Sequence, residues 1–135
     1  MKDIRPLSEQ GIIVWNSGLT KAQVMQLENI QKVALKIILN NEYSDYLLAC
    51  KTSGISTLSS RRAQLCSNFA VKLYKSKRCE EYFTKLQPKS GTRNLSKLVK
   101  ENPCRTKRCF NAPHNYLNRL VNANISKIIH GKQKL

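Results

Sequence analysis

The chain has 135 residues, of which 41% are hydrophobic, so it can bury one modest core. Its 5 Gly and 4 Pro are too few for a collagen-like chain or a turn-dense all-β chain. The 24 Lys and Arg exceed the 8 Asp and Glu and give a net charge of +16, which attracts polyanions.

The positive charge is concentrated in the second half of the chain. Residues 1–60 hold six basic and five acidic residues, a net charge of +1. Residues 61–135 hold the other 18 basic residues and three acidic ones, a net charge of +15. A surface selected only for solubility mixes both signs, so this asymmetry favours a nucleic-acid partner over an acidic membrane or an acidic protein.

Taken in chain order, the first apolar segment is residues 9–15, which are too few to distinguish a strand from the end of a helix. Asn16–Gly18 follows as a turn. A long helix is predicted from Thr20, where Thr20 and Gln23 fit a capping box, to Asn40–Asn41. Its predicted apolar stripe consists of Val24, Leu27, Ile30, Ala34, Ile37 and Ile38.

Two further helices are predicted in the middle of the chain. A short one covers residues 43–50 and closes at Ser53–Gly54. A long one starts after Ser56 or Thr57 and runs to about residue 75, with Arg61, Arg62, Lys72 and Lys75 on its polar face. A third, short helix is predicted over residues 80–86, before Pro88, with Tyr82, Phe83 and Leu86 as packing residues.

The remainder changes character after residue 86. Residues 87–108 are polar and basic, a composition typical of a loop, and a terminal helix is predicted over about residues 114–129. The predicted fold class is therefore all-α: a small domain of four to five helices, with a helical scaffold at 1–86 and a basic, partly irregular segment at 87–135. The predicted core residues are Trp15, Leu27, Ile30, Ala34, Ile37, Leu65 and Phe69.

The residue types that catalyse are sparse. The two aspartates, Asp3 and Asp45, are far apart in sequence, whereas a two-metal phosphoryl-transfer site needs clustered carboxylates. Glu80–Glu81 fits an ordinary helix surface, and both histidines lie in the basic tail. We therefore expect a chain that is not an enzyme and that carries no cofactor.

Cysteines offer one weak metal candidate. Cys104, Cys109 and His114 supply three soft ligands within eleven residues, but their spacing departs from that of zinc sites, and unligated thiols are the favoured interpretation.

The five cysteines are odd in number and irregularly spaced. The start of the sequence lacks a sustained apolar run, and no run is long enough to span a bilayer. These observations predict free thiols in an intracellular setting, nucleus or cytoplasm, with no membrane partner.

The basic segment has the composition of a polyanion-binding surface. Arg105–Arg108 (RTKR) is a tight basic cluster, also compatible with a nuclear-import patch, and Phe110, His114 and Tyr116 lie nearby. Lysine and arginine neutralise phosphates, and exposed aromatic rings stack on bases, although core packing is the favoured role for Tyr116. The candidate phosphate contacts are Arg61, Arg62, Lys72, Lys75, Lys77, Arg78, Arg105, Lys107, Arg108 and Arg119. No feature reads base sequence, so backbone contacts are expected.

Four segments occur in an order that is familiar. They are residues 15–23 (WNSGLTKAQ), 27–38 (LENIQKVALKII), 58–70 (LSSRRAQLCSNFA) and 104–122, which contains CRTKR, NAP and YLNRLVN. Together they resemble the region that follows the polymerase core in reverse transcriptases of jockey-like non-LTR retrotransposons, in order and approximate spacing over residues 14–122. The chain departs from the family pattern at His114–Asn115 and at residues 7–11, and this divergent start indicates a truncated reading frame.

The resemblance implies a helical thumb and post-polymerase region that contacts the element RNA and the template–primer duplex. The polymerase aspartates of the family would lie upstream of this segment. The chain is thus expected to be a non-catalytic fragment that binds RNA or an RNA/DNA duplex without sequence preference. Two alternatives stay open: a protein-interaction module of the same origin that presents its basic face to an acidic partner, and an enzyme in its own right.

Overall fold

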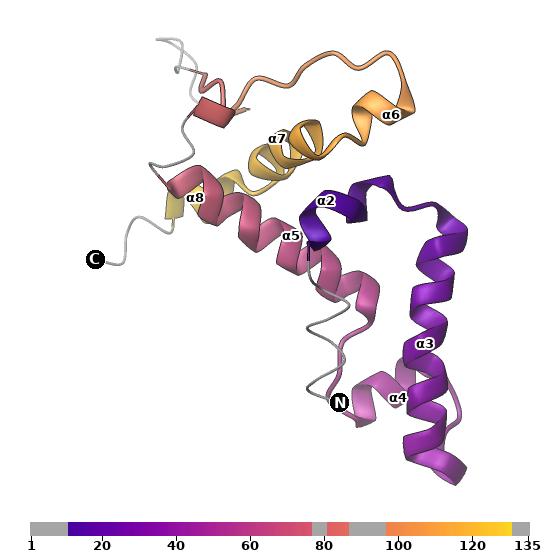
Figure 1. Cartoon of the computed structure of the whole chain (residues 1–135). Helices are drawn as coiled ribbons and strands as arrows, with labels where there is room; N and C mark the ends of the chain where they lie inside the picture. Colours follow the sequence, from indigo (N-terminus) through magenta and orange to yellow (C-terminus); the bar gives the residue numbers. More distant parts are fainter. Residues whose placement is uncertain (1–10, 77–80, 87–96, 131–135) are drawn as a thin grey trace. The chain divides into compact units, whose positions relative to one another are not determined.

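The computed structural model describes residues 11–76, 81–86 and 97–130, and this part of the chain is helical (Figure 1). The helices are α2 (Ile12–Trp15), α3 (Lys21–Leu39), α4 (Tyr46–Thr52), α5 (Leu58–Lys75), α6 (Lys107–Phe110), α7 (Pro113–Ala123) and α8 (Ile125–His130). Two 3-10 turns, Asn16–Gly18 and Asn40–Glu42, follow α2 and α3. The described residues contain no strand beyond an isolated bridge, which confirms the all-α prediction.

The chain divides into two compact units. Of the described residues, unit 1 contains 19–64, and unit 2 contains 11–18 together with those from 65 onward. The division falls within α5, so it does not coincide with the predicted boundary at residue 86.

Unit 1 is built on α3, whose start follows from its capping residues. The Thr20 hydroxyl accepts from the Gln23 amide, and the Gln23 side chain accepts from the Thr20 amide, which confirms the predicted capping box. Such a cap stabilises a helix by about 1 kcal/mol. α4 begins after Asp45, whose carboxylate accepts from the Leu47 amide. The two helices enclose a small core of Leu35, Ala49 and Cys50.

The predicted apolar stripe of α3 is correct only in part, since Val24, Leu27 and Ala34 are half-buried but the three isoleucines are exposed. Ile30 and Ile37, two predicted core residues, are 62% and 75% exposed. The buried side of the helix instead carries Gln31 and the fully buried Leu35. The reason is that the Gln31 amide satisfies its hydrogen bonds inside the unit, so a polar residue occupies a core position.

Unit 2 has its own core, drawn from segments far apart in sequence. Its buried residues are Ala70 on α5, Val121 on α7, Ile128 on α8, and Phe83 and Val99 outside the helices. Phe83 meets Tyr74 of α5 edge to face, with ring centroids 5.9 Å apart. In Figure 1 α8 lies beside the end of α5. Ala70 and Cys66 are fully buried on α5, whereas Phe69, a predicted core residue, is 42% exposed.

Two predictions in unit 2 need correction. Of residues 80–86, the described ones form no α-helix: after a single 3-10 turn at 81–82, Lys85 pairs with Val99 in an antiparallel bridge. Leu86 donates to Leu98, and Lys100 donates to Thr84, because Phe83 and Val99 reach the core best from extended backbone. The predicted terminal helix is two helices, interrupted at Asn124, whose amide donates to the Leu120 carbonyl.

Glycine is required at the start of α2. Gly11 has φ +66°, a left-handed conformation that other residues rarely adopt, and a Cβ there would contact the Trp15 ring.

Among the helices that the structure describes, none is both long and apolar enough to cross a membrane.

Candidate nucleic-acid interface

A partly buried polar cluster centred on Glu28 organises unit 1. The Glu28 carboxylate accepts from the Tyr46 hydroxyl and from the Ser59 amide. The Arg62 guanidinium lies 3.9 Å from the same carboxylate. Burial, followed by the hydrogen bond to Glu28, raises the pKa of the Tyr46 hydroxyl above its usual range, so this phenol stays protonated.

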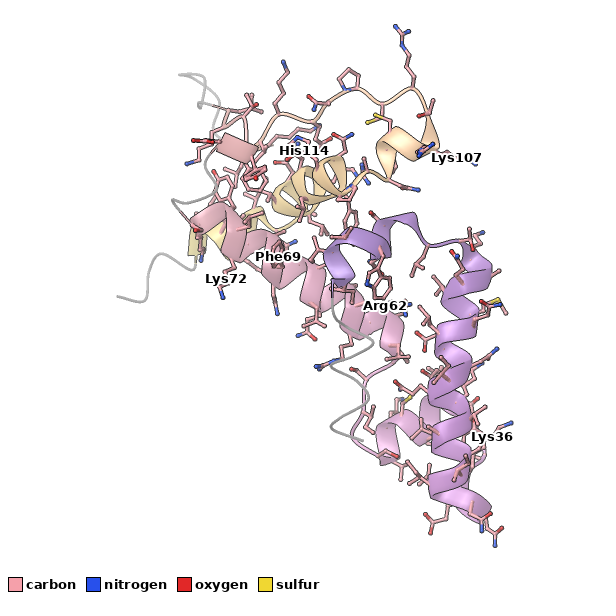
Figure 2. The ribbon with its side chains drawn as sticks, viewed as in Figure 1. Lys36, Arg62, Phe69, Lys72, Lys107 and His114 are labelled. Atoms are coloured by element: carbon pink, nitrogen blue, oxygen red, sulfur yellow. The ribbon has the colours of Figure 1, made fainter. Side chains whose placement is uncertain are left out.

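Arg62 therefore does not fit its predicted role as a phosphate contact. Its side chain, labelled in Figure 2, is 6% exposed. It is paired with Glu28. A phosphate would have to displace a buried ion pair, which is strongly unfavourable. The periodicity of α5 puts Arg62 on its polar face, and the carboxylate that neutralises it lies 34 residues earlier in the sequence. Arg61, its neighbour, is partly exposed and remains a candidate in unit 1.

In unit 2, Asn122 holds the extended segment that supplies Val99 to the core. Its side-chain oxygen accepts from the amides of Leu98 and Val99, at 2.9 and 3.0 Å. Its amide donates to the Val99 carbonyl at 3.0 Å and to the Glu101 carboxylate at 2.7 Å. A single side chain thus replaces the pairing that a neighbouring strand would give.

The Arg119 side chain makes contacts within unit 2. Its Nη1 donates to the Phe110 carbonyl at 2.6 Å, and its guanidinium carbon lies 3.5 Å from the centre of the Phe110 ring. These contacts fix α6 to α7, so Arg119 fits a structural role better than the predicted phosphate contact. Tyr116 is half-buried, accepts from the Asn16 amide, and has its pKa raised by burial, which agrees with packing rather than base stacking.

The exposed cations of unit 2 include five of the ten predicted phosphate contacts. Lys72 and Lys75 lie on the last two turns of α5. Arg105 precedes α6, and Arg108 and Lys107, which Figure 2 labels, lie on it. The helix begins after Thr106, whose hydroxyl accepts from the Cys109 amide. Lys77 and Arg78 lie outside the described residues.

Acidic side chains do little to offset this charge. In the described part of unit 2 they are Glu81 and Glu101. Glu101 is already engaged, since Asn122 and Lys97 both donate to it and lower the pKa of its carboxyl. The residual field of unit 2 is therefore strongly positive, as phosphate binding requires.

The structure does not gather Cys104, Cys109 and His114 into a metal site. Asn115 lies between the two sulfur atoms, and its amide donates to the Cys104 thiol at 3.3 Å. His114 faces Asn118, with its Nε2 3.4 Å from the Asn118 amide. Within the described ranges, no three His, Cys, Asp or Glu side chains are placed to hold a metal ion. Burial, followed by the neighbouring Cys109 thiol, raises the pKa of the Cys104 thiol.

Sequence reasoning missed the polar residues that organise each unit. Glu28, Gln31 and Asn122 are not among the core or site residues predicted from the sequence. A signal for them existed, because all three belong to the segments that carry the family resemblance. Comparison with known proteins finds no matching family model, no similar curated protein and no similar solved structure.

Proposed function

We propose that this chain is the thumb and post-polymerase part of a non-LTR retrotransposon reverse transcriptase. In this proposal it is non-catalytic and binds RNA or an RNA/DNA duplex through phosphate contacts, without reading sequence. The observation that carries the proposal is the exposed cationic surface of unit 2. Sixteen Lys and Arg face three Glu in the sequence of this unit, a net charge of +13.

The contacts of the family-like residues support the same proposal. Glu28 of the second segment pairs with Arg62 of the third. Gln31 donates to the Ser56 carbonyl at 3.1 Å, just ahead of the third segment. Asn122 of the fourth segment anchors the chain that precedes it. The contacts of these residues lie within each unit, which gives an architectural reason for their presence in the resemblance.

A salt titration with matched charge variants tests the proposal. The association constant for an RNA/DNA duplex should fall with salt, with a log–log slope of about −0.9 for each phosphate contact on a duplex. The double variant Lys72→Glu/Lys107→Glu should reduce the slope by about 2. The control Lys21→Glu/Lys51→Glu removes the same charge from exposed positions of unit 1 and should leave the slope nearly unchanged.

Two results would contradict the proposal. A salt-independent affinity, or no duplex binding at about 50 mM salt, would exclude phosphate-dominated binding and favour an acidic protein partner. Equal loss in the two double variants would show that total charge, rather than the surface of unit 2, governs the affinity.

A further inference from the structure

A hollow in unit 2 is lined by none of the phosphate contacts described so far. It has a volume of about 360 Å³ and lies among α2, α5, the start of α7 and residues 82–83. Its lining is apolar and aromatic apart from two polar groups, the His114 ring and the Tyr82 hydroxyl. Sites for small planar or apolar ligands have this size and composition.

Packing of the unit accounts for only part of this lining. Phe83 is buried and belongs to the core, where it meets Tyr74. Phe69 and Tyr82 remain 42% and 65% exposed, and Val14 is 68% exposed. Two aromatic rings and an aliphatic side chain that gather at one hollow and stay in contact with water mark a binding surface rather than a core.

The charge of the surroundings selects the kind of ligand. Lys72 lies one turn after Phe69 on α5 and is exposed, and His114 lines the hollow at the start of α7 (Figure 2). The acidic neighbours in sequence are Glu80 and Glu81, which come directly before Tyr82. The unit as a whole carries +13, so a ligand that combines a flat apolar surface with negative charge is favoured.

An unpaired base in a nucleic-acid strand has these properties. We propose that the hollow receives one unpaired base of a single-stranded segment, stacked on Phe69 and Tyr82, while the adjoining phosphates meet Lys72. Bases within a duplex are stacked on one another and cannot enter, so the site distinguishes single strands from duplex. This inference rests on the proposed nucleic-acid function and adds to it a site for a base. Aromatic stacking combined with a cationic surface is how sequence-tolerant single-strand binders work.

The test compares two single strands of equal charge, using the full chain. One probe is a fluorescein-labelled short oligothymidylate, and the other is the same backbone without bases. Binding is followed by fluorescence anisotropy at about 100 mM salt, where phosphate contacts alone are weakened. The wild-type chain should bind the base-bearing strand about tenfold more tightly.

Three variants identify the site. Phe69→Ala should bring the two affinities to within about twofold, since one aromatic ring is lost. Phe69→Leu keeps an apolar lining but no aromatic face, and should have the same effect. Ile129→Ala is the matched control, because Ile129 is 47% exposed in the same unit and does not line the hollow. It should keep the full preference.

The outcomes separate this inference from the function on which it rests. Equal binding of both strands by the wild-type chain would overturn the base site and leave phosphate binding intact. A preference that survives in Phe69→Leu would also overturn it and would indicate an apolar peptide as the occupant. Failure to bind either strand, or a duplex, would overturn the proposed function itself. Because Phe69 is only 42% exposed, its truncation also removes packing, and unchanged Trp15 fluorescence would verify the fold of each variant.

Discussion

Replacement of Asn122 by alanine gives the sharpest test of how unit 2 is held together. The substitution removes four hydrogen bonds and leaves two amides and one carbonyl of residues 98–99 without their partner. Val99 is fully buried, so water cannot replace all of these bonds. Each unsatisfied buried group costs about 1–3 kcal/mol, and partial solvation reduces the total to about 3 kcal/mol.

Alanine also has a higher helix propensity than asparagine, which offsets the loss by about 0.6 kcal/mol. Asn68→Ala provides the matched control, since Asn68 is an exposed asparagine of α5 and gains the same propensity. The difference between the two variants therefore isolates the hydrogen bonds of Asn122. For a domain of this size, a difference of about 3 kcal/mol in the free energy of unfolding corresponds to a loss of about 15 °C in Tm.

Urea unfolding followed by tryptophan fluorescence is the appropriate assay. The chain has one tryptophan, Trp15, and it belongs to unit 2, so the signal reports this unit even if the two units unfold separately. A difference of less than about 1 kcal/mol between Asn122→Ala and Asn68→Ala would refute the anchoring role. It would mean that the 98–101 segment is held by apolar contacts alone.

Three further predictions concern single side chains. Glu28→Gln should destabilise unit 1 by about 2 kcal/mol in hydrogen-exchange measurements on α3 and α4, because Arg62 loses its buried counter-charge, while the exposed Glu42→Gln should stay within about 0.5 kcal/mol. The lowered pKa of the Glu101 carboxyl adds stability that is complete above its ordinary pKa of 4.5 and is lost on acidification. Glu101→Gln should therefore reduce the change in the unfolding free energy of unit 2 with pH in the acid range. An unchanged dependence of this free energy on pH would contradict the prediction. The raised pKa of Cys104 should move the midpoint of its alkylation by iodoacetamide to higher pH in the native chain than in urea, as read by peptide mass spectrometry, and identical midpoints would exclude the shift.

The α-helices that sequence reasoning predicted best are those with local signals. α3 begins at the capping box of Thr20, and α5 begins after Thr57, whose hydroxyl accepts from the Ser60 amide. Both signals depend on residues three positions apart, so the chain reveals them without knowledge of the fold. The break at Asn124 depends instead on a distant partner, because the Ser67 hydroxyl donates to its side chain across 57 residues.

The buried side of each helix and the position of the candidate site were harder to predict, because both depend on contacts between residues far apart in the sequence. Ile30 and Gln31 are neighbours on α3, yet the isoleucine is exposed and the glutamine is buried. Only the Ser56 carbonyl, 25 residues away, makes burial of that amide favourable. Likewise, the sequence shows Arg62 as a cation but cannot show that Glu28 neutralises it. The hollow at Phe69 needs segments that begin as far apart as residues 13 and 113.

The order in which the two units occur along the chain has a consequence for synthesis on the ribosome. Residues 19–64 of unit 1 form one continuous stretch, so their partners emerge together. α2 belongs to unit 2, and the Asn16 amide that follows it donates to the Tyr116 hydroxyl, 100 residues later. At a synthesis rate of about 5–20 residues per second, Tyr116 is made about 5–20 s after α2. Unit 1 can therefore fold while the first segment of unit 2 still exposes Ile12 and Trp15, and a chaperone that binds apolar segments has a binding site there until Tyr116 is made.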